Sequence, residues 1–230
     1  GALLKRPLPL FSTFIMTIDL KGLGARIPRL MVGKVGVGDA PQVVPEIVLA
    51  SGSVVRARLL KNAGLDFTVD VAAVDEETIK ESMLAENASA RDIADELAEL
   101  KALRVSRRHP EALVIGADQI LGLGKDMFDK PVGMDGARNH LQSLRGKEHR
   151  LVTACVVQNG KPLWRHVEIP KLTMRNFSDE FLEDYLAASG TKILSSVGGY
   201  LLEERGAQLF SKIDGDYFSI LGLPLLQLLD

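Results

Sequence analysis

Hydrophobic and polar positions follow two patterns along the chain. Continuous apolar runs, which are typical of strands buried on both faces, occupy residues 47–50 and 113–121. Two further strand-like runs, at 150–157 and 164–169, are joined by an Asn-Gly pair at 159–160 that favours a hairpin turn. We therefore expect a sheet with a buried, parallel-type strand at 113–121 and an antiparallel hairpin.

Stretches with helical character lie between these strands. Each begins beside a residue that can cap a helix or ends at a glycine that can close one. Because strands and helices alternate without a repeat or an internal linker, residues 46–230 are predicted to form one α/β domain. The predicted helices span residues 54–63, 89–103, 135–145 and 178–190.

Residues 1–45 differ in composition from this domain. They carry six basic and two acidic side chains and five of the ten prolines, with no apolar period that persists. The apolar run after Lys5 and Arg6 is too short to span a bilayer and lacks a cleavage site, which argues against a secretory signal. We interpret residues 1–45 as an irregular N-terminal extension: a disordered segment, a tag, or a wrongly assigned start upstream of Met16 or Met31.

The charge and the cysteine content exclude several classes of function. The 230-residue chain has 28 Lys and Arg against 30 Asp and Glu, so no excess of positive charge would coat a nucleic acid. Its single cysteine, Cys155, cannot form an internal disulfide, and no Cys or His cluster has the spacing of a zinc site. We therefore expect a cytoplasmic protein that binds neither nucleic acid nor membrane.

A strand-to-helix turn at residues 51–53 has the features of an anion site. Ser53 can cap the helix that follows, so several backbone N–H groups and the positive end of the helix dipole point to one place. Arg56 and Arg58 add positive charge beside it. The alternative is an ordinary capped helix with surface arginines.

A single carboxylate, Asp118, interrupts the apolar run at 113–121. Burying an isolated carboxylate costs several kcal/mol, so this side chain is expected to be paired or bound to a metal ion. The alternative is an acid at the end of a strand that caps a neighbouring turn.

A set of short motifs occurs in order along the domain. Its members are Leu-Ala-Ser-Gly-Ser at 49–53 with Arg56, Val-Asp-Glu at 74–76, Lys-Ala at 101–102, Gly-Ala-Asp-Gln at 116–119, Lys-Pro at 130–131, Gly-Ala at 206–207, Ile-Asp-Gly-Asp-Tyr at 213–217 and Gly-Leu-Pro-Leu at 222–225. The set resembles the Maf family of nucleoside triphosphate pyrophosphatases, once called septum-formation inhibitors. None of the resemblance extends into residues 1–45.

The resemblance implies a fold and a reaction. The fold is an α/β one with a mixed, strongly twisted sheet flanked by helices, similar to that of inosine triphosphate pyrophosphatase, and the protein is usually a homodimer. The reaction splits a nucleoside triphosphate between its α- and β-phosphates and releases a nucleoside monophosphate and pyrophosphate.

Phosphate and metal ligands are also implied by the resemblance. Ser53 and Arg56 would hold phosphate at the strand-to-helix turn, and Lys101 and Lys130 would neutralise charge from facing elements.

Two carboxylates complete the implied machinery. Glu76, in an acidic cluster followed by a polar stretch to residue 87, would bind Mg²⁺ or Mn²⁺. Asp118 would orient or deprotonate the attacking water and also touch the metal.

Departures from the family pattern bear on the nucleotide base. Val55 stands where most members have an aromatic or cationic side chain, whereas Gln119 and Glu203 resemble the branch that acts on 7-methyl-GTP. The Glu203 carboxylate can accept hydrogen bonds from guanine N1–H and its 2-amino group, and it offsets the positive charge of a methylated base. The resemblance favours 7-methyl-GTP or another modified nucleotide, with dTTP and UTP as the alternative.

Two rival hypotheses stand beside this one. The domain could bind a nucleotide without hydrolysing it and regulate cell division or stress, since Val54 and Val55 depart from the pattern. Alternatively, Cys155 or Ser51 could attack phosphorus without a metal, although Cys155 lies in an apolar strand where a packed thiol is expected. The four histidines fit no metal spacing and are interpreted as structural or surface groups.

Overall fold

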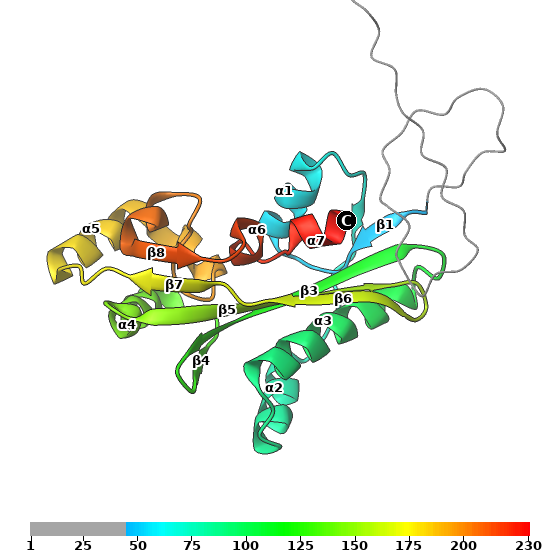
Figure 1. Cartoon of the computed structure of the whole chain (residues 1–230), viewed down its shortest axis with the longest axis horizontal. Coiled ribbons are helices and arrows are strands. Elements are labelled where there is room, and N and C mark those ends of the chain that lie inside the picture. The colour runs from blue at the N-terminus through cyan, green and yellow to red at the C-terminus, as the bar shows by residue number, and fades with distance from the viewer. Residues whose placement is uncertain (1–44) are drawn as a thin grey trace, which may run out of the picture.

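The computed structural model describes residues 45–230. An eight-stranded sheet runs through this part of the chain in the order β2-β1-β3-β5-β7-β8, with β4 paired to β3 and β6 paired to β5 (Figure 1). The extension predicted at residues 1–45 lies outside the described residues, except for Pro45. The strands are β1 (Ile47–Leu49), β2 (Thr68–Val69), β3 (Leu113–Leu123), β4 (Asp126–Phe128), β5 (Glu148–Gln158), β6 (Pro162–Glu168), β7 (Lys171–Met174) and β8 (Phe210–Asp214).

The sheet is mixed, as the resemblance implies. β1 pairs in parallel with β2 and β3, whereas β3 pairs antiparallel with β5 from Val114 to Gly122. The expectation of a parallel-type strand at 113–121 is therefore wrong for most of its length. A continuous apolar run indicates that a strand is buried on both faces, and helices cover both faces of β3 here. Burial does not specify the direction of the neighbouring strand.

The predicted hairpin is confirmed. β5 and β6 pair antiparallel from Thr153 to Gln158, and the turn contains Gly160 with φ +68°. A positive φ is the conformation that such tight turns require and that glycine adopts without strain.

Helices cover both faces of the sheet (Figure 1). α2 and α3 lie on one face, α1, α6 and α7 lie on the other, and α4 and α5 lie toward the end that carries β7 and β8. Among the described helices, none is long and apolar enough to cross a membrane. The helices are α1 (Val54–Asn62), α2 (Glu76–Ala85), α3 (Ala90–Ser106), α4 (Gly133–Leu144), α5 (Asp179–Ser189), α6 (Tyr217–Ile220) and α7 (Leu225–Leu229), with 3₁₀ turns η1 (Gly190–Ser195) and η2 (Arg205–Leu209).

Serine side chains begin α1, α3 and α5, as predicted. Ser53 Oγ accepts the backbone N–H of Arg56 at 3.3 Å, and Ser178 caps α5 in the same way. Ser89 forms a capping box with Asp92, in which each side chain accepts the other residue's backbone N–H. These bonds satisfy amide groups that have no partner inside the helix.

The sequence pattern failed to predict α2 and the short helices α6 and α7, and α2 is the longest of the three. None of its residues is buried, and its few apolar residues do not form the wide apolar stripe from which a helix is recognised. It begins at Asp75, whose carboxylate accepts from the backbone N–H and the hydroxyl of Thr78. Ile79 and Met83 are partly buried and pack against the apolar cluster that contains Ile93 and Leu97 of α3. Glu76 consequently stands in the first turn of a helix and not in a polar loop.

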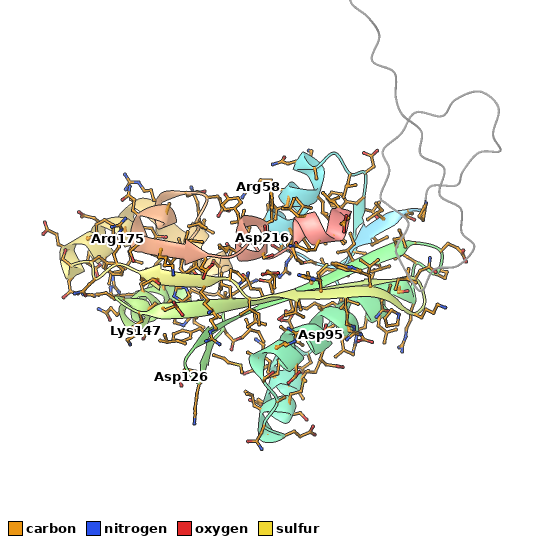
Figure 2. All side chains as sticks on the ribbon, viewed as in Figure 1. Arg58, Asp95, Asp126, Lys147, Arg175 and Asp216 are labelled. Atoms are coloured by element: carbon orange, nitrogen blue, oxygen red, sulfur yellow. The ribbon has the colours of Figure 1, made fainter. Side chains whose placement is uncertain are left out.

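β3 and α3 approach each other closely in the middle of the domain. A Cβ at Gly116 would overlap the carbonyl oxygen of Ala98 and lie 2.8 Å from Ala102 Cβ, so only glycine permits this contact. Ile93 and Leu97 of α3 are fully buried on the same face, and each contributes about 1.5–3 kcal/mol through burial. Side chains fill the space between the sheet and the helices on both faces (Figure 2).

Candidate active site

A pocket of about 880 Å³ opens among α1, α2, α3 and β3. This volume lies in the range of small-molecule binding sites. The lining includes every residue that the sequence assigned to catalysis, substrate or metal: Ser53, Arg56, Glu76, Lys101, Asp118, Gln119, Lys130 and Glu203. The fold thus gathers these side chains into one cavity, although their roles stay predictions.

The alternation of side chains along β3 supplies two walls of the pocket. Asp118 points to α3, as Ile120 does, whereas Gln119 points to the face that carries α1 and α6. Successive strand residues face opposite sides of a sheet, so one strand presents a carboxylate to one wall and an amide to the other.

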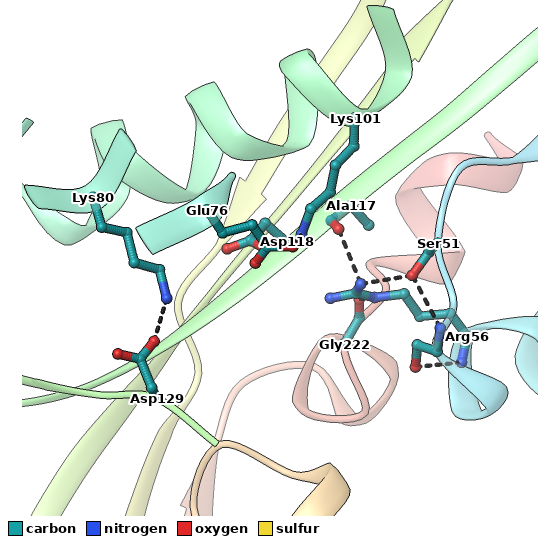
Figure 3. Close-up of polar contacts among 10 residues, drawn as sticks. Ser51, Arg56, Glu76, Lys80, Lys101, Ala117, Asp118, Asp129 and Gly222 are labelled. Atoms are coloured by element: carbon teal, nitrogen blue, oxygen red, sulfur yellow. Dashed lines mark hydrogen bonds and ion pairs between the residues drawn. The ribbon is translucent and has the colours of Figure 1, made fainter. Parts of the chain in front are cut away.

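Lys101 reaches from α3 to two carboxylates (Figure 3). Its Nζ lies 2.6 Å from Asp118 Oδ1 and 2.9 Å from Glu76 Oε1. The side chains of Asp118 and Lys101 are 7% and 11% exposed, whereas that of Glu76 is 45% exposed. Asp118 is paired, as expected of a carboxylate inside a strand, and it does not cap a turn. In this arrangement the Lys101 ammonium neutralises two carboxylates, and its contact with phosphate stays a prediction.

Arg56 is held on the other side of β3 by three hydrogen bonds (Figure 3). Its Nε donates to the carbonyl oxygen of Gly222 at 2.7 Å, and its Nη1 donates to Ser51 Oγ at 3.0 Å and to the carbonyl oxygen of Ala117 at 2.9 Å. Burial lowers the pKa of Arg56, while nearby carboxylates oppose the shift. The guanidinium is thereby oriented before any ligand arrives, which reduces the entropy lost on binding an anion.

Gln119 is anchored by its amide nitrogen. Nε2 donates to Thr153 Oγ1 at 2.8 Å and to the carbonyl oxygens of Ser219 and Ile220 at 3.0 and 3.2 Å. These contacts direct the amide donors into the protein and leave the side-chain oxygen as the group that could meet a ligand.

The ion pair between Lys80 and Asp129 is a part of the pocket that sequence reasoning missed. It joins α2 to the segment after β4, and both residues line the pocket beside Lys130 (Figure 3). Recognition of α2 would have revealed Lys80, because residues four apart share a helix face and Glu76 is four positions earlier. The carbonyl oxygen of Gly222, which holds Arg56, leaves no signal in a sequence.

The pocket contains more carboxylates than cations. Four basic and six acidic side chains line it. Phosphate oxygens would be repelled by this surplus unless further positive charge enters with them. The basic residues are Arg56, Lys80, Lys101 and Lys130, and the acidic ones are Glu76, Glu77, Glu81, Asp118, Asp129 and Glu203.

Histidines take no part in the lining of this pocket. Within residues 45–230, no group of three or more His, Cys, Asp or Glu side chains could hold a metal ion by protein ligands alone. The interpretation of the histidines as structural or surface groups agrees with their contacts. These are His109 with Asp70, His140 with Phe128, His149 with Tyr200, and His166 with Glu168.

The two candidate nucleophiles lack activation. Cys155 is buried in β5, and burial raises the pKa of its thiol to about 12, so the thiol is protonated near neutral pH. Ser51 lines the pocket, but its Oγ accepts hydrogen bonds from Arg56 and from the backbone N–H of Ser53, neither of which can act as a base. The packed-thiol interpretation of Cys155 is confirmed.

The fold and the pocket together define a class of protein. A mixed α/β sheet carries a strand-to-helix turn with a fixed arginine on one wall and a carboxylate cluster on the other, which defines an α/β protein with a small-molecule pocket suited to an anionic ligand at the turn. Comparison with known protein families identifies the family. The family described as "Maf-like protein" matches residues 46–230, and the chain belongs to it.

Similar curated proteins carry related names. The chain is 57% identical over 184 residues to "Nucleoside triphosphate pyrophosphatase" of Paramagnetospirillum magneticum, which covers 80% of this chain and 95% of that protein. It is 53% identical to the protein of the same name from Rhodospirillum rubrum, over 82% of this chain and 94% of that one. It is also 51% identical to "7-methyl-GTP pyrophosphatase" of Mesorhizobium japonicum, over 80% and 93%. The prediction of a family of phosphoanhydride hydrolases is confirmed.

Proposed function

We propose that this chain is a metal-dependent nucleoside triphosphate pyrophosphatase that acts on a modified nucleotide such as 7-methyl-GTP. The reaction adds water across the anhydride between the α- and β-phosphates. The P–O bond of that anhydride breaks, and a nucleoside monophosphate and pyrophosphate leave. The names of the relatives support the reaction class.

The observation that carries the proposal is the placement of Asp118 opposite Arg56 in one pocket. Arg56 is oriented by protein contacts and can bind a phosphate oxygen, and Ser53 lies at the adjacent helix start. Lys101 contacts Asp118 through Oδ1, which leaves Oδ2 to orient the attacking water and accept its proton. The buried position of Asp118 limits competition from bulk water.

Glu76 and Asp118 are the residues that would hold a divalent cation. Mg²⁺ is commonly bound by one or two carboxylates together with waters and substrate phosphates, so two protein ligands suffice. Both carboxylates contact the same ammonium, that of Lys101, and the pocket has a surplus of negative charge that a cation would offset. When bound, Mg²⁺ or Mn²⁺ would supply positive charge to the phosphates and lower the pKa of a coordinated water.

Glu203 and Gln119 support the choice of base. Both line the pocket, and the Glu203 carboxylate suits the donor edge of guanine and the positive charge of a 7-methylated ring. The Mesorhizobium japonicum relative bears the name of a 7-methyl-GTP pyrophosphatase.

A substrate panel tests the proposal. Purified protein is given 7-methyl-GTP, GTP, ATP, CTP, dTTP or UTP with Mg²⁺ or Mn²⁺, and released pyrophosphate is measured. We expect the highest kcat/KM with 7-methyl-GTP and no release with a chelator. A preference for dTTP and UTP would move the chain to the other branch of the family. Release from no nucleotide, with binding retained, would identify a nucleotide-binding regulator.

Asp118→Asn tests the role of the proposed base. We expect turnover to fall by at least about 10²-fold, the usual scale for a positioned base, while nucleotide binding persists. Asp135→Asn is the matched control, because Asp135 lies on α4, is exposed and does not line the pocket. Near-normal turnover of Asp118→Asn would show that this carboxylate is not the catalytic base.

The family resemblance also supports a homodimer, which we propose as the assembly in solution. Light scattering coupled to size-exclusion chromatography measures the mass directly, and a value near the 25.0 kDa of one chain would contradict it.

A further inference from the structure

A residue outside the pocket, Arg58, contacts one of the residues that line it. Arg58 lies on α1, above the sheet in Figure 2, and its Nη2 donates to Glu203 Oε1 at 2.7 Å. Glu203 stands in the turn that precedes η2, 145 residues further along the chain. Glu203 lines the pocket, whereas Arg58 is not among the lining residues. A residue beyond the pocket thus binds the carboxylate of a residue that lines it.

The two side chains differ in exposure, and the less exposed one belongs to the residue that lines the pocket. The Arg58 side chain is 48% exposed, and that of Glu203 is 16% exposed. An unpaired glutamate samples several rotamers, and fixing a flexible side chain costs about 0.5–1.5 kcal/mol when a ligand binds. With Oε1 held by Arg58, the carboxylate is already oriented and Oε2 remains for a ligand.

We propose that Arg58 is a positioning residue that holds Glu203 so that the pocket selects a guanine-type base. This inference rests on the proposed function, because it assumes that a nucleotide enters the pocket. Guanine offers two adjacent donors, N1–H and the 2-amino group, to a carboxylate. Uracil and thymine offer one N–H group between two carbonyl oxygens. A fixed carboxylate repels these carbonyl oxygens. Orientation of Glu203 therefore raises affinity for guanine and lowers it for these pyrimidines.

The α1 helix links this selection to phosphate binding. Arg56 and Arg58 are two positions apart on α1, so they point to nearly opposite sides of the helix. Arg56 turns toward β3 and Gly222, and Arg58 turns to Glu203. Val55, which also lines the pocket, offers no polar atom to a base, so selection at this end depends on Glu203.

Binding of uncleavable analogues provides the test. Dissociation constants are measured for the α,β-methylene triphosphates of guanosine and uridine with the wild type, Arg58→Gln, Glu203→Gln and the double variant. We expect Arg58→Gln to reduce the preference for the guanosine compound by about three- to tenfold, the equivalent of one immobilised side chain. Arg58→Lys keeps the charge and should recover part of the preference.

The double variant separates positioning from a general structural effect. If Arg58 acts through Glu203, Arg58→Gln changes nothing further in the Glu203→Gln background. Arg138→Gln is the matched control, because it breaks an ion pair with Glu183 that is remote from the pocket, and it should leave the preference unchanged. Equal shifts in Arg58→Gln and Arg138→Gln, or additive effects in the double variant, would overturn the inference.

Turnover separates this inference from the proposed function. A wild type that prefers the guanosine analogue, loses that preference in Arg58→Gln and yet releases no pyrophosphate from any triphosphate supports the positioning role and refutes the enzyme activity. A wild type that hydrolyses nucleotides with the same base preference as Arg58→Gln supports the activity and refutes the positioning role. Failure to bind either analogue refutes the positioning role, and pyrophosphate release alone then decides the proposed activity.

Discussion

Replacement of Lys101 by methionine would leave the Asp118 carboxylate without its partner inside the protein. The Asp118 side chain is 7% exposed and its Oδ1 lies 2.6 Å from Lys101 Nζ. Removal of one member of a buried ion pair costs about 3–5 kcal/mol, because the other charge stays buried without compensation. Glu76, the second partner of Lys101, is 45% exposed, so water can solvate its carboxylate after the lysine is removed. We therefore take the lower end of this range of costs. We expect Lys101→Met to lower the free energy of unfolding by about 3 kcal/mol.

A double-mutant cycle with Asp118→Asn isolates the cause of this loss. Once the carboxylate is replaced by a neutral amide, Lys101→Met no longer strands a buried charge, and we expect it to cost less than about 1 kcal/mol. Urea unfolding followed by circular dichroism gives the four free energies. Lys61→Met, at an exposed position on α1, controls for the loss of a lysine and should change stability by no more than about 0.5 kcal/mol.

Equal losses from Lys101→Met in the two backgrounds would refute this reasoning, because the coupling between Lys101 and Asp118 would then be absent. Added Mg²⁺ gives a second measurement. If a cation binds between the carboxylates, saturation at about 100 times its Kd returns about 2.7 kcal/mol to Lys101→Met. We expect a smaller gain in the wild type, where the Lys101 ammonium already contacts both carboxylates.

Further predictions concern packing, pH and metal. Gly116→Ala should destabilise by about 1–3 kcal/mol and reduce turnover, since a Cβ would push α3 and Lys101 away, whereas Gly122→Ala meets nothing within 4 Å and should be tolerated. Burial lowers the pKa of His149 to about 4, so the folded protein resists protonation of this side chain. The free energy of unfolding is therefore expected to fall by about 3 kcal/mol as the pH decreases from above 6.5 to 4. The difference in unfolding free energy between wild type and His149→Phe should therefore shrink over that interval, and a constant difference would contradict it. Glu76→Gln should raise the metal concentration for half-maximal activity at least about tenfold, and an unchanged titration would show that Glu76 does not bind metal.

Local signals in the sequence accounted for four of the eight strands and four of the seven α-helices of the described residues. Ser89 and Ser178 marked helix starts because capping is a contact between near neighbours in the chain. α2 was not predicted because its residues are mostly polar, and a helix is recognised in a sequence by a wide apolar stripe. The direction of β5 against β3 was also beyond reach, since burial looks the same beside a parallel or an antiparallel neighbour.

The sequence by itself determined which residue types could perform the chemistry, and it required that Asp118 find a partner, because an unpaired carboxylate in an apolar strand costs too much free energy. Only the tertiary structure decided that this partner is Lys101, that a carbonyl oxygen of Gly222 orients Arg56, and that Arg58 holds Glu203. Each of these contacts joins segments that are distant in the chain. Such pairings depend on the packing of α1, α3 and β3, which no local pattern of residues encodes.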